Sequence, residues 1–277
     1  MTYEFSLAHL TVLQCTPPEM VTIASKAGYQ YVSLRMTAVT ANEKICSLMD
    51  DRAMMRETRA RMADSGVGLL DIELARMDPQ TEPEAYLKFL ETGAELGARA
   101  VIAQLPDPDR KRATERFGRL CDLAQPMGLT VDLEFPSWTA TPDLKAAAAV
   151  IAAVNKPNAG LLVDTLHFDR SRSRLEDLRH VPREWFHFIH LCDAPQEIPT
   201  TEEEIIYTAR AGRLFPGEGG LNLQEILACM PAVPYSLEIP NDALMKALGP
   251  EAFARRAIRA AERFLEGQPT LMSQGFH

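Results

Sequence analysis

Four side chains that could bind a metal ion stand where apolar, strand-like segments end. They are Glu134, Asp164, His190 and Glu238, which close segments 130–134, 160–164, 185–190 and 235–238. A carboxylate at the end of a buried strand must find a cation or several donors, because an unpaired buried charge is very costly. Three carboxylates and one imidazole suit Mn²⁺, Mg²⁺ or Co²⁺, with Zn²⁺ possible, and leave room for substrate oxygens. The sequence therefore predicts one divalent metal ion.

Each of these residues, taken alone, is better explained as a solvated loop residue. That reading weakens because the same pattern recurs at the ends of the other strand-like segments. Side chains alternate along a strand, so the parity that turns Glu134 inward gives four further inward-facing residues at strand ends. These are His9, Arg35, Glu73 and Gln104. We predict that all eight polar strand ends face one site.

The elements that must position these residues alternate between strand and helix patterns along the whole chain. The eight strands are expected at 5–9, 31–35, 68–73, 100–104, 130–134, 160–164, 185–190 and 235–238. Helices between successive strands favour parallel pairing with right-handed crossovers. With eight units and no glycine-rich dinucleotide fingerprint, an α/β fold consisting of a closed (β/α)8 TIM barrel is preferred to an open sheet. We expect residues 1–266 to form a single barrel domain and residues 267–277 a C-terminal tail.

Composition excludes several classes of partner. The formal net charge of −9 argues against nucleic-acid binding, which normally needs a basic face. No apolar run approaches the roughly 20 residues that span a bilayer, so no membrane association is expected. The five cysteines are scattered and lack a CxxC pair, which favours reduced thiols and a cytoplasmic location.

Three motifs give the chain a more specific resemblance. They are D-x-x-H at 164–167, H-x-x-D at 190–193 and R-x-x-P-G-x-G at 213–219. Together with the strand-end residues they resemble the xylose isomerase-like TIM barrels, the sugar phosphate isomerase/epimerase superfamily. The resemblance implies that Glu134, Asp164, His190 and Glu238 bind the metal. It also implies that His167 and Arg213 contact substrate.

The function expected from this site is isomerisation or epimerisation of a small sugar or polyhydroxy keto compound. The metal would chelate a carbonyl oxygen and a neighbouring hydroxyl and stabilise the enediolate that forms when an α-proton leaves. Glu134 and Glu238 would exchange that proton. His9 and Gln104 are candidates for contacts with substrate hydroxyls, while Glu73 either contacts substrate or pairs with Arg35.

The main alternative is a lyase, a metal-dependent dehydratase of the inosose or 3-dehydroshikimate type. It shares the first half-reaction, and His167 would then act as acid or base. A Schiff-base aldolase is disfavoured because no strand end carries a lysine, and an AP endonuclease because the chain is acidic. A barrel that binds a ligand without catalysis remains a further alternative. Relatives of this kind are often dimers or tetramers, so a homodimer or tetramer is possible.

Overall fold

The computed structural model describes residues 3–40, 43–46 and 48–267, so the predicted tail lies outside the described residues except for Gly267. Its centre is one parallel sheet whose strands follow the order β6-β5-β4-β3-β2-β1-β9-β8-β7. The strands are β1 (Phe5–Leu7), β2 (Tyr31–Arg35), β3 (Gly68–Arg76), β4 (Ala100–Gln104), β5 (Thr130–Leu133), β6 (Ala159–Leu161), β7 (Val163–Asp164), β8 (Ile189–Leu191) and β9 (Tyr235–Leu237).

The sheet closes on itself through residues 159–164. Only Leu162 separates β6 from β7, and these two short strands correspond to the single sixth strand expected from the sequence. β6 pairs with β5, whereas β7 pairs with β8, so both edges of the sheet meet on the same stretch of chain. The predicted TIM barrel is confirmed.

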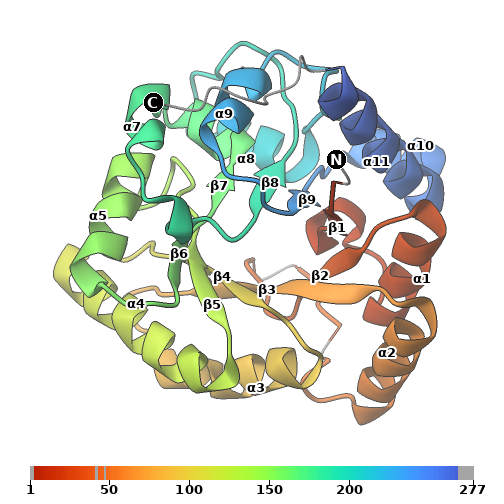
Figure 1. Cartoon of the computed structure of the whole chain (residues 1–277), viewed down its shortest axis with the longest axis horizontal. Coiled ribbons are helices and arrows are strands. Elements are labelled where there is room, and N and C mark those ends of the chain that lie inside the picture. The colour runs from red at the N-terminus through yellow and green to blue at the C-terminus, as the bar shows by residue number, and fades with distance from the viewer. Residues whose placement is uncertain (1–2, 41–42, 47, 268–277) are drawn as a thin grey trace, which may run out of the picture.

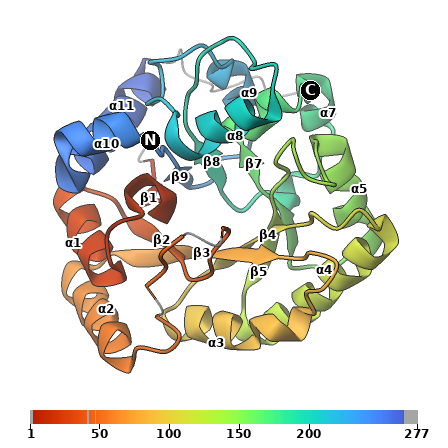
Figure 2. The same cartoon turned by 180° about the vertical axis from the view of Figure 1, so that it is seen from behind.

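Helices form an outer ring around the strands, as both sides of the molecule show (Figures 1 and 2). Among the described residues, none of these helices is long and apolar enough to cross a bilayer. The helices are α1 (Pro17–Ala27), α2 (Arg52–Ser65), α3 (Leu87–Glu95), α4 (Arg110–Ala124), α5 (Leu144–Val154), α6 (Thr165–Arg170), α7 (Leu175–Arg179), α8 (Glu202–Ala211), α9 (Leu223–Cys229), α10 (Asp242–Leu248) and α11 (Pro250–Glu266).

Apolar side chains pack on both faces of the barrel wall. A large cluster fills the space between strands and helices, and a smaller one fills the barrel interior. The inner cluster contains Tyr31, Leu70, Leu74, Ala100, Ile102, Leu162 and Phe188. Leu162 and Phe188 lie two residues before Asp164 and His190, as strand alternation requires. The inner cluster therefore forms a floor beneath the predicted metal ligands.

Some predicted boundaries are wrong. Strand β1 ends at Leu7, and His9 begins a 3-10 helix (His9–Val12). Strand β8 starts at Ile189, because residues 183–185 form another 3-10 turn. Helices α6 and α10 were not expected at all. Each begins at a polar N-cap residue, Asp164 for α6 and Asn241 for α10, whose side chain accepts hydrogen bonds from backbone N–H groups. Because Asp164 was interpreted as a metal ligand, its capping role was not predicted.

A partly exposed histidine just before β8 pairs with a buried aspartate, and this pair makes stability depend on pH. His187 Nδ1 lies 2.7 Å from Asp132 Oδ1. A Cβ on Gly160 would lie 2.2 Å from that same oxygen, so only glycine leaves room for the pair. Burial lowers the pKa of His187, but the hydrogen bond and charge of Asp132 outweigh it and raise the pKa overall.

We therefore expect the free energy of unfolding to fall as pH rises from about 6.5 through the raised pKa, because the charged pair is present only below it. His187→Gln should flatten this dependence in urea unfolding followed between pH 6 and 8.5. The control His180→Gln alters an exposed histidine whose Nδ1 bonds to the Glu176 carbonyl, and it should keep the wild-type slope. Equal slopes in wild type and His187→Gln would contradict the assignment.

Candidate metal centre

The four predicted ligands converge at the carboxyl ends of their strands. Glu134, Asp164, His190 and Glu238 are all buried, and one ligand atom from each lies within 4.8 Å of the other three. The carboxylate oxygens Glu134 Oε1, Asp164 Oδ2 and Glu238 Oε2 lie 3.5, 3.6 and 3.4 Å from His190 Nδ1. A tetrahedral ion with bonds of about 2.1 Å holds its ligands about 3.4 Å apart. The spacing therefore fits one divalent ion.

Local structure orients Asp164. Its Oδ1 accepts the backbone N–H groups of Leu166 and His167 at 2.8 and 3.1 Å, which caps helix α6. The cap turns the other oxygen, Oδ2, toward the centre. Burial favours the neutral acid, but Arg213 and then His167 and His190 outweigh burial and hold the pKa of Asp164 well below its usual range. Asp164 is thus ionised, and its Oδ2 has a fixed direction.

Arg213 is fully buried and joins two of the ligands. Its Nη1 donates to Asp164 Oδ2 at 2.6 Å, and its Nη2 lies 2.8 Å from Glu238 Oε2. Its Nε donates to the Ala209 carbonyl at 2.9 Å. Against the effect of burial, Arg213 and His190 lower the pKa of Glu238 to about 2. Arg213 therefore reaches the site as predicted, but its donors engage protein carboxylates and carbonyls.

His190 supplies an independent test of whether a cation fits. Neither ring nitrogen has a hydrogen-bond partner among the described residues, although the side chain is only 1% exposed. An imidazole held unbonded among three acids is costly, because buried polar groups are normally paired. A divalent cation at the centre would engage Nδ1 and offset the negative charge that Arg213 alone leaves unbalanced. The donor set present therefore fits a metal ion.

The third acid, Glu134, pairs with no arginine in the part of the chain that the structure describes. Its Oε2 accepts from Gln104 Nε2 at 2.6 Å, so Gln104 orients a predicted ligand. The Nε2 atom of His167 lies 3.9 Å from Glu134 Oε1, while its Nδ1 is buried and has no hydrogen-bond partner among residues 3–40, 43–46 and 48–267. The His167 ring meets Trp138 edge-on at 5.1 Å between centroids. His167 thus lies beside the acid cluster, with Nε2 on the side of Glu134.

His9, a candidate for contacts with substrate hydroxyls, has both ring nitrogens bonded to the backbone. His9 Nε2 donates to the Cys15 carbonyl at 2.9 Å, and its Nδ1 accepts from the Arg35 N–H at 3.0 Å. Burial lowers the pKa of His9 to about 4, so the ring is neutral. Because β1 ends early, both nitrogens serve the backbone, and the geometry gives His9 a structural role instead of the expected substrate contact.

Glu73 takes the second of its two expected roles. Its Oε2 accepts from Arg35 Nη2 at 2.7 Å and from Nε at 3.1 Å. Arg35 Nη1 also donates to Glu43 Oε1 at 2.8 Å, so one buried guanidinium bridges two acids. The Glu73 carboxylate of β3 is therefore held by the Arg35 guanidinium of β2.

The carboxylate of Asp193, the last residue of the H-x-x-D motif, accepts four backbone hydrogen bonds. Its Oδ2 accepts from the backbone N–H groups of Gly217 and Gly219 at 3.0 Å each, and its Oδ1 from Leu221 at 3.0 Å and Ala194 at 2.8 Å. A Cβ on Gly219 would lie 2.4 Å from Asp193 Oδ1, which explains the glycine. Asp193 therefore fixes the loop that follows Arg213.

Asp193→Ala is expected to lower the free energy of unfolding by about 3 to 5 kcal/mol, because it leaves four backbone donors unpaired. Asp193→Asn keeps one acceptor oxygen and should lie between wild type and alanine. Urea unfolding of the three proteins measures the series. A loss below 1 kcal/mol in the alanine variant would show that the loop holds without the carboxylate.

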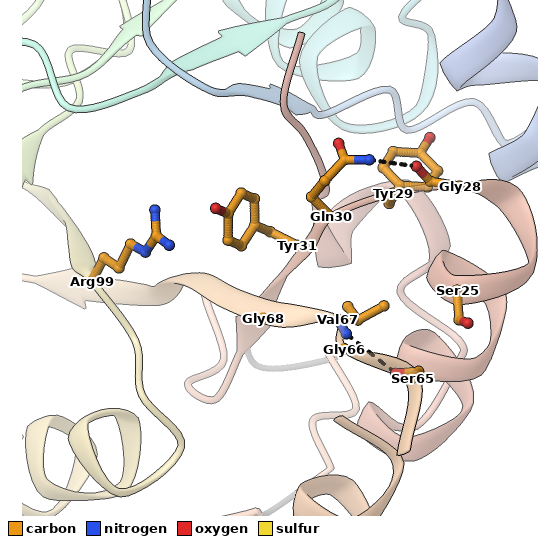
Figure 3. A pocket seen from close by; sticks show the side chains of 10 residues that line it. All are labelled: Ser25, Gly28, Tyr29, Gln30, Tyr31, Ser65, Gly66, Val67, Gly68 and Arg99. Atoms are coloured by element: carbon orange, nitrogen blue, oxygen red, sulfur yellow. Dashed lines mark hydrogen bonds between the residues drawn. The ribbon is translucent and has the colours of Figure 1, made fainter. Parts of the chain in front are cut away.

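A hollow of about 540 Å³ lies elsewhere, at the amino ends of β2, β3 and β4. Tyr31, Gly68 and Arg99 line it together with the turns before β2 and β3 (Figure 3). The Arg99 guanidinium lies 4.6 Å from the centroid of the Tyr31 ring. None of the predicted site residues borders this hollow, and the amino-terminal face of a TIM barrel normally serves stability.

Comparison with known proteins supports the same family. The family model described as xylose isomerase-like TIM barrel matches residues 21–265. An inosose isomerase of Bacillus subtilis is 24% identical over 186 residues, which cover 63% of this chain and 64% of the relative. A 3-dehydroshikimate dehydratase of Pseudomonas aeruginosa is 27% identical over 129 residues, 45% of this chain and 20% of the relative. The chain spans 64% or less of the curated relatives it matches.

Among solved structures, an IOLI protein crystallised with a bound zinc atom superimposes with a TM-score of 0.78 at 19% identity. The superposition covers 96% of this chain and 99% of that one, which establishes a shared fold. Because the family model extends over most of the chain, this protein belongs to the xylose isomerase-like TIM barrel family.

Proposed function

We propose that this protein is a divalent-metal-dependent isomerase or epimerase of a small sugar or polyhydroxy keto compound. One observation carries the proposal: four buried ligand atoms from four strand ends lie within 4.8 Å of one another. The similarity to an inosose isomerase supports an isomerase. The bound ion would supply Lewis-acid stabilisation of the negative charge that develops on the substrate's oxygens.

The choice of ion follows from the donor set. Three hard carboxylate oxygens and one imidazole suit Mn²⁺, Mg²⁺ or Co²⁺. The spacing also suits Zn²⁺, and the zinc atom in the IOLI protein supports it as a candidate. We propose Glu134, Asp164, His190 and Glu238 as the ligands of a single ion.

The two glutamates have different surroundings, and this assigns their roles. The Arg213 contact and a pKa of about 2 keep Glu238 ionised and poorly suited to release a proton. Glu134 accepts a hydrogen bond from the neutral amide of Gln104 and pairs with no arginine within the described residues, so it is the better placed of the two to take a proton from a substrate carbon. We therefore propose Glu134 as the group that takes the proton and returns it, and Glu238 as a second, ionised base that faces the other side of the substrate.

His167 and Arg213 complete the proposed site. His167 Nε2 faces the acid cluster, 3.9 Å from Glu134 Oε1, so we propose that it holds or protonates a substrate oxygen. Arg213 acts on substrate through the carboxylates it orients. Gln104 keeps its amide on Glu134, and we propose that it positions this base in addition to contacting substrate hydroxyls.

A dehydratase is the second candidate, supported by the similarity to a 3-dehydroshikimate dehydratase. Proton removal by Glu134 would be shared with the isomerase. A hydroxyl group β to the carbonyl would then leave as water, and His167 would donate the proton to it. The cytoplasmic location and a homodimeric or tetrameric state remain predictions.

Incubation of metal-loaded protein with keto-sugars, inososes and dehydroshikimate in D₂O tests both candidates. Deuterium at the α-carbon without loss of water supports an isomerase or epimerase, whereas an enone product supports the dehydratase. Exhaustive chelation should abolish turnover, and re-addition of Mn²⁺, Mg²⁺, Co²⁺ or Zn²⁺ should restore it. Full turnover after chelation would overturn the metal-dependent mechanism.

A further inference from the structure

A set of polar side chains lies inside the barrel below the proposed metal centre. Ser6 of β1, Ser33 of β2, Asp71 of β3 and Ser236 of β9 are all fully buried. Ser33 Oγ donates to Asp71 Oδ1 at 2.5 Å. Within the described part of the chain, three other atoms of this set have no hydrogen-bond partner, namely Ser6 Oγ, Asp71 Oδ2 and Ser236 Oγ.

Strand register shows that these atoms share the interior with His190. Ser6 pairs with Ser236 across β1 and β9, and Ser236 pairs with His190 across β9 and β8. Partners on neighbouring strands lie about 5 Å apart and turn their side chains to the same face. Because His190 points into the barrel, both serine hydroxyls do so as well.

Asp71 approaches from the opposite wall. It pairs with Ala100, a member of the inner apolar cluster, so its side chain also points inward. Since β6 and β7 form one strand of the ring, β3 and β8 are four strands apart in either direction. Asp71 and His190 therefore face each other across the barrel axis. No direct hydrogen bond joins them among the described residues.

His190 needs a partner on that side of its ring. Its Nδ1 faces the three carboxylates, so a ring that binds metal through Nδ1 carries its proton on Nε2. Metal-binding histidines normally donate this second N–H to a carboxylate, a carbonyl or a water. Nε2 has no such partner within the described residues, and Asp71 Oδ2 is an acceptor that also lacks one.

We propose that Asp71 is a positioning residue for His190, linked to its Nε2–H by an ordered water that the hydroxyls of Ser6 and Ser236 help to hold. The proposal rests on the metal centre proposed above. A buried water requires two to four polar partners, and this position offers four. The water accepts from His190 Nε2–H and passes a hydrogen bond to Asp71 Oδ2.

The hydroxyls allow the network to balance in either protonation state. Burial raises the pKa of Asp71 to about 8. An ionised Asp71 accepts a hydrogen bond from the water, and a protonated Asp71 donates one while the water donates to a serine hydroxyl. In both cases His190 Nε2–H keeps an acceptor, and the ring stays oriented toward the ion.

Asp71→Asn tests the proposal, with Asp132→Asn as its matched control. Asp132 is equally buried and faces inward, but its oxygens already bond His187 and Thr130. The first readout is the Zn²⁺ dissociation constant, measured by competition with a chromophoric chelator. The second is the Nε2–H proton signal of His190 in Zn²⁺-loaded protein labelled with ¹⁵N-histidine.

We expect Asp71→Asn to weaken Zn²⁺ binding about 10- to 100-fold and to shift or broaden the Nε2–H signal. Asp132→Asn should leave the affinity within about twofold of wild type. Unchanged affinity and signal in Asp71→Asn would overturn the proposal while the metal centre stands. If wild type itself binds no Zn²⁺ or other divalent ion, the proposed function fails together with it.

Two further measurements keep the test decisive if Asp71→Asn does not fold. Ser236→Ala removes one hydroxyl from the water and should weaken Zn²⁺ binding in the same direction by a smaller factor. A crystal structure of the Zn²⁺-loaded wild type should show a water within hydrogen-bond distance of Asp71 Oδ2 and His190 Nε2. An interior without that water would overturn the proposal.

Discussion

Glu134→Gln is expected to reduce turnover by about 10²- to 10⁴-fold, because the amide cannot accept the substrate's proton. Its carbonyl oxygen still offers the ion a ligand, so the protein should retain metal. Solvent deuterium should therefore stop entering the substrate while metal content stays close to stoichiometric. Rates, deuterium incorporation and metal content measured on one preparation separate loss of the base from loss of the ion.

The control for this change is Glu218→Gln, which makes the same substitution at a half-exposed glutamate paired with Arg256. Its turnover should match wild type. The assignment of Glu134 fails if Glu134→Gln exchanges deuterium at the wild-type rate. If Glu238→Gln alone abolishes exchange, the two glutamates have the opposite roles.

Arg213→Met is expected to lower the free energy of unfolding of metal-free protein by about 3 to 5 kcal/mol. The change leaves Asp164 and Glu238 as buried carboxylates without their shared cation. A divalent ion supplies positive charge at the same oxygens, so saturating metal should stabilise this variant more than it stabilises wild type. Thermal and urea unfolding with and without metal measure both effects.

Arg59→Met is the matched control, because Arg59 forms an ion pair with Glu95 in which both side chains are 57% exposed. Exposed pairs contribute little, so its free energy of unfolding should stay within about 0.5 kcal/mol of wild type. If Arg213→Met unfolds like Arg59→Met, the guanidinium is not the counter-charge that we assign to it.

The parallel barrel and the convergence of the four strand-end residues were predictable from sequence. Alternation along a strand fixes which side chains face inward, and parallel strands bring their carboxyl ends to one rim. Asp164 and His190 follow this rule, with Leu162 and Phe188 packed beneath them in the inner cluster.

Loops and turns set the limits of that reasoning. His9 was expected to face substrate, but β1 ends two residues earlier and a 3-10 turn directs both ring nitrogens to the backbone. The motif at 213–219 indicated that Arg213 reaches the site. The ion pairs of Arg213 with Asp164 and Glu238 depend on the path of a loop, which no sequence periodicity predicts. The hydrogen bonds that this loop donates to Asp193 fix that path.

The six residues from Ala159 to Asp164 pair with β5 at one end and with β8 at the other. The pairing that joins the sequence-distant ends of the ring is that of β1 with β9, which ends one residue before the proposed ligand Glu238. Such non-local pairings are slow to form and come late in assembly. A bound metal ion would then chiefly slow the unfolding of the closed barrel and would have little effect on its rate of folding.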